Sequence, residues 1–122
     1  MKPSFDDSKP VFQSIAEWLE DAVLAEIYPE ESKVPSITEI SVQYNLNPAT
    51  ALKGINLLVD GGILYKKRGV GMFVVTGARE KLLLQRRKEF LDEYIIPLLG
   101  EAKRLGLSTA DLKSMIARGE LR

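Results

Sequence analysis

The chain of 122 residues contains no cysteine and no histidine. Without cysteine it has no disulfide framework, no iron–sulfur cluster and no thiol nucleophile. Without histidine it lacks the commonest general base and the commonest zinc ligand. Its acidic residues are scattered along predicted helix surfaces, where solvation explains them better than carboxylate catalysis does. We therefore expect no enzyme, no metal site and no cofactor.

Long apolar stretches are also missing. No run approaches the roughly 20 apolar residues needed to cross a bilayer, and the first ten residues lack an apolar signal core. We therefore expect a cytoplasmic protein without a membrane partner. Hydrophobic residues make up 45% of the chain and charged residues 28%, which is ordinary for a folded protein. The length suits a single domain, or a small domain with an oligomerisation arm.

The net charge is zero, but the charges are unevenly distributed along the chain. Residues 1–65 hold 4 basic and 10 acidic residues, a net charge of −6, whereas residues 66–88 hold 8 basic and 1 acidic, a net charge of +7. Phosphate contacts are local, because salt screens charges beyond roughly 8 Å. Lys66, Lys67 and Arg68 therefore favour a nucleic-acid contact. The basic residues of 79–88 are better explained as a solvated helix surface.

Apolar spacing predicts a first helix that starts at Pro10 and ends between residues 25 and 28. Its inner face is predicted to carry Val11, Ile15, Leu19, Val23 and Ile27. Ser36 and Glu39 form a capping box for a second helix over about 37–44. Asn45 tolerates the left-handed backbone that ends this helix.

A third helix is predicted to start with Asn47 as N-cap and Pro48 as its first residue. It continues to residue 59 or 60, and Gly61 and Gly62 end it. Its core positions are Ala51, Ile55 and Leu58. The period then changes to two, which predicts a hairpin with strands near 64–68 and 72–75 and a turn at Gly69 and Gly71.

A long helix is predicted from about Ala78 to Gly106, kinked by Pro97. Its apolar residues recur at three- and four-residue steps, which is typical of a helix packed against a partner. The series consists of Leu84, Leu91, Ile95, Leu98, Ala102 and Leu105, with Lys88 as its one interruption, and Leu83, Phe90 and Tyr94 form a flanking stripe. A second capping box, Ser108 with Asp111, opens a last helix with Leu112, Met115 and Ile116 facing inward.

Three helices followed by a glycine-tipped hairpin predict a winged helix-turn-helix over residues 1–76. The fold class is mainly α with a small β-hairpin, and a two-helix C-terminal dimerisation arm follows over residues 77–122. In such a module the third helix enters the major groove, while the hairpin lies along the backbone. Thr50 and Lys53 face outward near its start, as do Asn47 and Ala49. Ala49 could touch a thymine methyl and Lys53 a phosphate or guanine, whereas capping alone explains Asn47 equally well.

These motifs together resemble the DNA-binding domain of the GntR family of bacterial transcription regulators, across about residues 10–76. The matching segments are PVFQSIA at the entry, VPSITEI at the second helix, NPAT at the third, GGIL at its exit and RGVGMFV at the hairpin. The short helical tail and the Asn-Pro pair are similar to the YtrA-type subfamily, whose tail is a compact dimerisation arm. The resemblance implies a dimeric repressor that binds double-stranded DNA at a palindromic operator.

The resemblance also implies a set of DNA-binding residues. They are Ser36, Thr38, Asn47, Ala49, Thr50, Lys53, Lys66, Lys67, Arg68, Gly69 and Gly71. The chain departs from the family at two positions, because members commonly carry arginine where Thr38 stands and near Pro48. Each departure removes a cation, so affinity or operator preference should differ from that of other members.

Two questions remain open from the sequence. The chain could instead be a winged-helix scaffold that binds a partner protein and never touches DNA. The arm surface at Leu91, Tyr94, Ile95 and Leu98 could hold a small apolar effector, although core packing explains these residues better. A steep fall of DNA affinity with rising salt would separate the regulator from the scaffold.

Overall fold

The computed structural model of the chain describes Phe5 and residues 8–120. The chain forms two compact units, residues 1–84 and residues 85–122. The predicted domain limits at residues 1 and 122 lie outside the described residues. Within the described residues, no helix is both long enough and apolar enough to cross a membrane.

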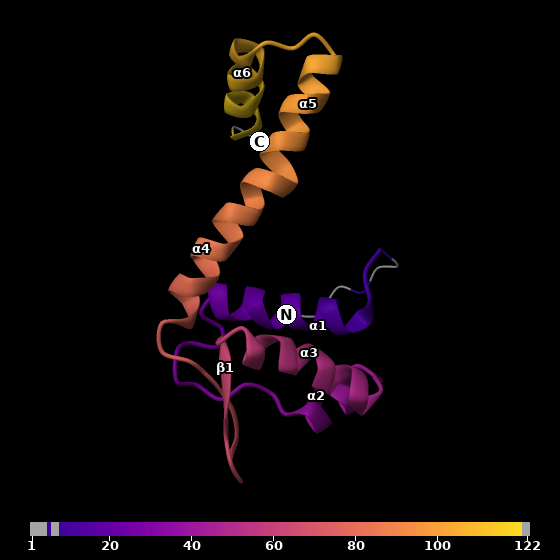
Figure 1. Cartoon of the computed structure of the whole chain (residues 1–122), viewed down its shortest axis with the longest axis vertical. Coiled ribbons are helices and arrows are strands. Elements are labelled where there is room, and N and C mark those ends of the chain that lie inside the picture. Colours follow the sequence, from indigo (N-terminus) through magenta and orange to yellow (C-terminus); the bar gives the residue numbers. More distant parts are fainter. Residues whose placement is uncertain (1–4, 6–7, 121–122) are drawn as a thin grey trace. The chain divides into compact units, whose positions relative to one another are not determined.

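The first unit is a helical domain with a two-stranded antiparallel hairpin (Figure 1). Its helices are α1 (Val11–Leu24), α2 (Ile37–Gln43) and α3 (Pro48–Asp60). The hairpin, which we call the wing, consists of β1 (Leu64–Lys67) and β2 (Gly71–Val74) and is followed by α4 (Ala78–Phe90). The predicted fold class is confirmed, since the described residues are mainly helical and contain this one hairpin.

Local capping sets the ends of α2 and α3 as predicted. The Ser36 hydroxyl accepts a hydrogen bond from the Glu39 backbone N–H at 3.0 Å, and the Glu39 carboxylate accepts one from the Ser36 N–H at 3.3 Å. The Asn47 side-chain oxygen accepts from the Ala49 N–H at 2.9 Å. Asn45 has a φ of 52°, the left-handed conformation that separates the two helices.

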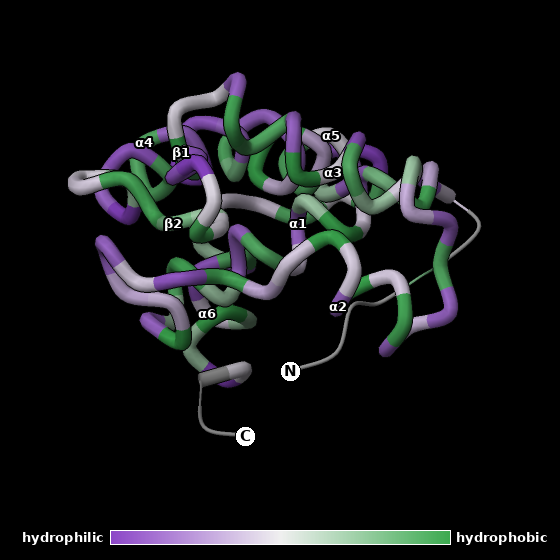
Figure 2. The backbone as a smooth tube through the Cα atoms, turned by 90° about the horizontal axis from the view of Figure 1, so that it is seen from below, coloured by the Kyte–Doolittle hydropathy of each residue, from purple (hydrophilic) through white to green (hydrophobic). Residues whose placement is uncertain are grey.

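The core of the first unit lies where α1 and α3 pack together. Buried residues include Ile15 and Leu19 of α1, Ala51, Ile55 and Leu58 of α3, and Leu64 and Val74 of the wing. Gly54 of α3 allows a close approach, because a Cβ there would lie only 2.8 Å from the Phe12 carbonyl oxygen. Figure 2 shows hydrophobic and hydrophilic residues following one another along α3.

The predicted core positions of Val11 and Ile27 are wrong, because their side chains are 37% and 52% exposed. The helix α1 ends at Leu24, and Glu26 adopts a left-handed φ of 58°. The Ile27 N–H then bonds the Ala22 carbonyl at 2.9 Å, closing a Schellman-type turn. This turn carries Ile27 off the helical face on which its spacing would have placed it.

The segment 31–34 pairs with β2 through an isolated antiparallel bridge and flanking backbone hydrogen bonds. The Val34 N–H bonds the Met72 carbonyl at 2.9 Å, and the Val74 N–H bonds the Ser32 carbonyl at 3.0 Å. Lys33 forms an antiparallel bridge with Phe73. The base of the wing is therefore tied to the loop that precedes α2.

The second unit is helical throughout its regular elements. It contains the end of α4, a π-helical turn η1 (Leu91–Ile95), α5 (Ile96–Arg104) and α6 (Thr109–Glu120). The predicted disturbance at Pro97 takes the form of this π-helical turn. A proline lacks a backbone donor and its ring collides with the carbonyl four residues earlier, and a widened turn relieves both problems.

The ends of α5 and α6 also follow the predicted signals. Gly106 has a φ of 69° after the last turn of α5, and Ser108 and Asp111 form the expected reciprocal capping bonds. The predicted inward side of α6 is only partly confirmed. Leu112 is buried, whereas Met115 and Ile116 are exposed, so only one edge of α6 packs within this unit.

Candidate nucleic-acid interface

The exposed face of α3 lies opposite the side that packs on α1. Gly54 marks the packed side, since it meets the Phe12 carbonyl and the Ile15 side chain. Ala49, Leu52 and Asn56 recur at steps of three and four residues, and all three are exposed. We call these three residues the α3 stripe, and they form an uncharged surface over two turns of the helix.

Lys53 lies on the flank of α3 between the stripe and α1. Its ammonium nitrogen stands 4.1 Å from the centroid of the Phe12 ring, a cation–π contact that holds the charge beside the start of α1. Lys53 is exposed, whereas Thr50 is half-buried. Of these two residues, which were both predicted to face outward, Lys53 is accessible and the Thr50 hydroxyl group belongs to a partly covered side chain.

The side chains that begin α2 and α3 are engaged as caps but keep donors for a ligand. The acceptor oxygens of Ser36 and Asn47 already receive backbone N–H groups. The Ser36 hydroxyl hydrogen and the Asn47 amide hydrogens can still donate, for example to a phosphate. Ser36 is half-buried, while Thr38 and Asn47 are exposed.

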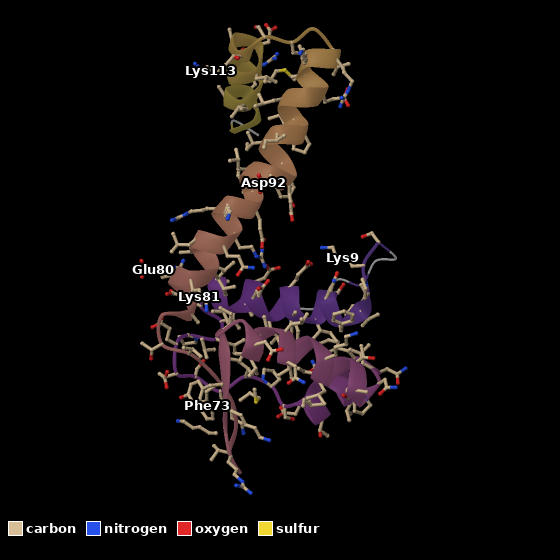
Figure 3. All side chains as sticks on the ribbon, viewed as in Figure 1. Lys9, Phe73, Glu80, Lys81, Asp92 and Lys113 are labelled. Carbon is tan, nitrogen blue, oxygen red and sulfur yellow. The ribbon has the colours of Figure 1, made fainter. Side chains whose placement is uncertain are left out.

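The register of the wing gives it two different faces. Leu64 pairs with Val74, and both are buried against the core. Tyr65 pairs with Phe73 on the opposite face, with ring centroids 6.0 Å apart. Phe73, labelled in Figure 3, thus belongs to a half-buried aromatic pair on the outer face of the hairpin.

The cations of the wing lie at its free end. Lys66, Lys67 and Arg68 are all exposed. The Lys67 ammonium lies 4.3 Å from the Phe73 ring centroid and 5.9 Å from that of Tyr65. Both rings therefore make cation–π contacts with this charge. In Figure 1 the hairpin extends past α3 on the side away from α1. The cations therefore project on the same side of the domain as the α3 stripe.

Two glycines shape the tip of the wing. Gly69 has a φ of 78° and Gly71 a φ of 145°, values that disfavour residues with a Cβ. A side chain at Gly71 would also lie 2.7 Å from the Lys33 side chain. The Lys33 side chain thus reaches the start of β2 from the bridging segment 31–34 and adds a fourth cation beside the wing.

A carboxylate braces the base of the wing. Glu31 accepts hydrogen bonds from the Tyr65 hydroxyl and from the Thr76 hydroxyl and N–H, the last two at 2.8 and 3.1 Å. The bonds from Tyr65 and then Thr76 hold the pKa of the Glu31 carboxyl below its ordinary value. The same bond to Glu31 raises the pKa of the Tyr65 hydroxyl. Glu31 therefore links the loop before α2 to β1, through Tyr65, and to the residues that follow β2, through Thr76.

The predicted dimerisation residues divide by exposure. Leu84, Phe90, Leu91, Tyr94, Leu98 and Leu105 are exposed, Ile95 is half-buried and Ala102 is buried. The Phe90 and Tyr94 rings pack against each other with centroids 5.5 Å apart. Ala102 therefore packs within its own unit, while the exposed residues from Phe90 to Leu105 leave an apolar surface on the second unit.

Sequence reasoning missed three residues of this surface: Lys33, Leu52 and Asn56. Lys33 joins the wing only through pairing with a strand forty residues later, which no local pattern reports. Leu52 and Asn56 continue the helical spacing of Ala49, and this periodicity could have identified them. Among the described residues, no cluster of carboxylates could hold a metal ion.

Curated relatives of the chain are named as transcriptional regulators. NorG of Staphylococcus aureus, an HTH-type transcriptional regulator, is 29% identical over 96 residues, 73% of this chain, but the chain spans only 21% of the length of NorG. The uncharacterized HTH-type transcriptional regulator YhcF of Bacillus subtilis is 26% identical over 113 residues, covering 92% of this chain and 91% of YhcF. No protein-family model matches the chain.

Solved structures share the fold. A GntR-family transcriptional regulator from Bacteroides thetaiotaomicron has a TM-score of 0.78 and 28% identity, covering 92% of this chain and 97% of its own. The AraR DNA-binding domain, solved in complex with operator ORR3, has a TM-score of 0.54 and 25% identity over 62% of this chain and 92% of its own. The first of these likenesses extends over both units of the chain.

Proposed function

We propose that this chain, which has the fold and sequence likeness of a GntR-family winged-helix transcriptional regulator, is a sequence-specific DNA-binding repressor. It acts in the cytoplasm as a homodimer on a palindromic operator. One observation carries this proposal: a single domain presents the uncharged α3 stripe and four wing cations on the same side. An uncharged helix face suits the major groove, and flanking cations suit the phosphate backbone.

Each part of this surface has a role in the proposed complex. The start of α3, with Asn47, Ala49 and Thr50, lies in the major groove, and Lys53 contacts a phosphate on the flank of the helix. Lys66, Lys67 and Arg68 contact the backbone, and Gly69 and Gly71 let the tip approach it closely. Ser36 and Thr38 donate to phosphates from the start of α2. The operator complex of AraR, a domain of the same fold, supports this docking.

The proposed dimer forms through the C-terminal helices. A helical surface that exposes Leu91, Tyr94 and Leu98 together is unusual for a monomer and typical of an interface. Residues 1–76 then act as the DNA-binding domain and residues 77–122 as the dimerisation arm, as in the YtrA-type subfamily. Two-fold symmetry predicts half-sites about one helical turn apart, roughly 34 Å.

Gel-shift titrations of variants test the proposed DNA contacts. The probe is a duplex selected from a random pool by the 122-residue chain. We expect Lys53→Ala to weaken binding to this duplex, and Arg68→Ala to weaken binding to this duplex and to random duplex alike, since a wing phosphate contact carries no sequence information. Lys113→Ala, an exposed lysine of α6, is the matched control and should bind as the parent does.

If Lys53→Ala and Arg68→Ala both bind like the parent protein, the assigned contacts are wrong. If the parent shows no affinity for any duplex in dilute buffer, the chain is not a DNA-binding regulator. The repressor role is tested separately, by transcription in vitro from a promoter that contains the selected site. Transcript levels should fall as the protein is added, and a rise would indicate an activator.

A further inference from the structure

We propose that Leu52 is a specificity-determining residue that reads the C5-methyl group of a thymine in the operator. This inference rests on the proposed function and refines it, because it assigns base readout to a side chain that can form no hydrogen bond. It follows from three observations: the position of Leu52 on α3, its exposure, and the charges that surround the α3 stripe.

The position of Leu52 is set by the packing of α3. Gly54 faces the backbone of α1, and Lys53 reaches toward Phe12 on the same flank. Leu52 lies on the opposite flank, one turn after Ala49 and one turn before Asn56. It therefore occupies the middle of the stripe, on the part of α3 that faces away from α1. The hairpin itself extends past α3 on the side away from α1 (Figure 1).

The exposure of Leu52 has no explanation in the fold itself. The core of α3 is complete with Ala51, Ile55 and Leu58, and Leu52 remains 43% exposed beside it. A single exposed leucine is common on protein surfaces. Here, however, Leu52 belongs to an uncharged stripe in a domain that also carries a cationic hairpin. A partner that covers both surfaces carries many negative charges where it meets the hairpin and an apolar group where it meets Leu52.

Thymine in duplex DNA meets both requirements. The phosphates match the cations of the wing and Lys53, and the only methyl group on a base edge of the major groove belongs to thymine. Leucine has no donor or acceptor, so it cannot discriminate bases in any other way. The amide of Asn56, one turn further along, can pair with the N6 and N7 atoms of adenine. The stripe as a whole therefore favours A·T base pairs at the steps that it faces.

The test is a double-mutant cycle between Leu52 and single thymine methyl groups. The DNA is a duplex enriched from a random pool by the 122-residue chain, and each thymine in turn is replaced by deoxyuridine. This replacement removes the methyl group and keeps every hydrogen-bonding atom. Dissociation constants are measured by fluorescence anisotropy for the parent protein and for Leu52→Ala. The matched control is Leu57→Ala, a leucine of the same helix that is 44% exposed but lies on the α1 flank beyond Lys53.

At one thymine in each half-site, deoxyuridine should weaken binding of the parent and of Leu57→Ala by about fourfold, the value for burial of one methyl group. The same replacement should leave binding of Leu52→Ala unchanged. Circular dichroism should show that all three proteins are equally folded, as expected for exposed positions.

The inference is overturned if no deoxyuridine replacement weakens binding of the parent more than binding of Leu52→Ala. It is also overturned if Leu57→Ala becomes as insensitive to the replacement as Leu52→Ala. It is also overturned if the protein binds duplexes tightly but enriches no sequence, a result that leaves DNA binding itself intact. A failure of the parent protein to bind any duplex would instead reject the proposed function.

Discussion

The close approach of α1 and α3 at Gly54 predicts that Gly54→Ala destabilises the first unit. This substitution tests which face of α3 is buried, and hence which face is free for DNA. The added Cβ would lie 2.8 Å from the Phe12 carbonyl oxygen and 3.1 Å from the Ile15 Cβ and Cγ2 atoms. None of these atoms belongs to the end of a flexible side chain, so the helices must move apart.

The expected size of the effect is the difference between two terms. Forcing extra volume into a packed core costs about 1 to 3 kcal/mol, and alanine recovers about 1 kcal/mol over glycine as a helix former. Because the nearest atom is a backbone oxygen, we expect a cost near the upper limit and a net loss of about 1 to 2 kcal/mol. For a unit of this size, that loss lowers the melting temperature by about 5 to 15 °C.

The assay is thermal and urea unfolding followed by the fluorescence of Trp18, the only tryptophan of the chain, which is buried in α1. Asn56→Ala is the control, since it adds a better helix former on the exposed side of the same helix and should leave stability unchanged or slightly raised. If Gly54→Ala is as stable as the parent, α1 and α3 do not meet at Gly54, and the assignment of the α3 stripe to DNA loses its basis.

Three further predictions concern the wing and the arm. The pKa of Glu31 lies below its ordinary value of 4.5, so the stabilising contribution of the ionised carboxylate is present above pH 4.5. This contribution is lost as the pH falls through the lowered pKa. The parent should therefore lose more stability than Glu31→Gln on acidification below about pH 5. If the urea midpoints of the two proteins fall equally across that range, the Glu31 carboxylate does not stabilise the base of the wing. Leu98→Glu should raise the dimer dissociation constant about 30-fold or more in analytical ultracentrifugation, and an unchanged dimer would reject the proposed interface. Lys33→Ala should weaken binding to selected and random duplex equally, and a loss confined to the selected duplex would assign Lys33 to base readout.

Structural features that depend on residues close together in the sequence could be predicted. The capping boxes at Ser36 and Ser108 involve partners three residues away, and the turn at Asn45 depends on that residue alone. The wing was predictable for the same reason, because two glycines and a change of period mark it locally.

Features that depend on distant partners could not be predicted. Lys33 joins the wing through Phe73, and Glu31 binds Thr76 forty-five residues later. Ile27 fits the helical spacing of α1, yet a left-handed residue before it redirects the chain.

The salt dependence of DNA binding tests the central claim most directly, namely that the wing cations contact phosphates while the α3 stripe faces the bases. Dissociation constants for the selected duplex are measured across a range of salt concentrations for the parent protein and for Arg68→Ala. We expect the logarithm of affinity to fall linearly with the logarithm of salt, and the slope to shrink by about 1 for each protomer that loses Arg68. An affinity that does not change with salt, or an equal slope for both proteins, would contradict the account.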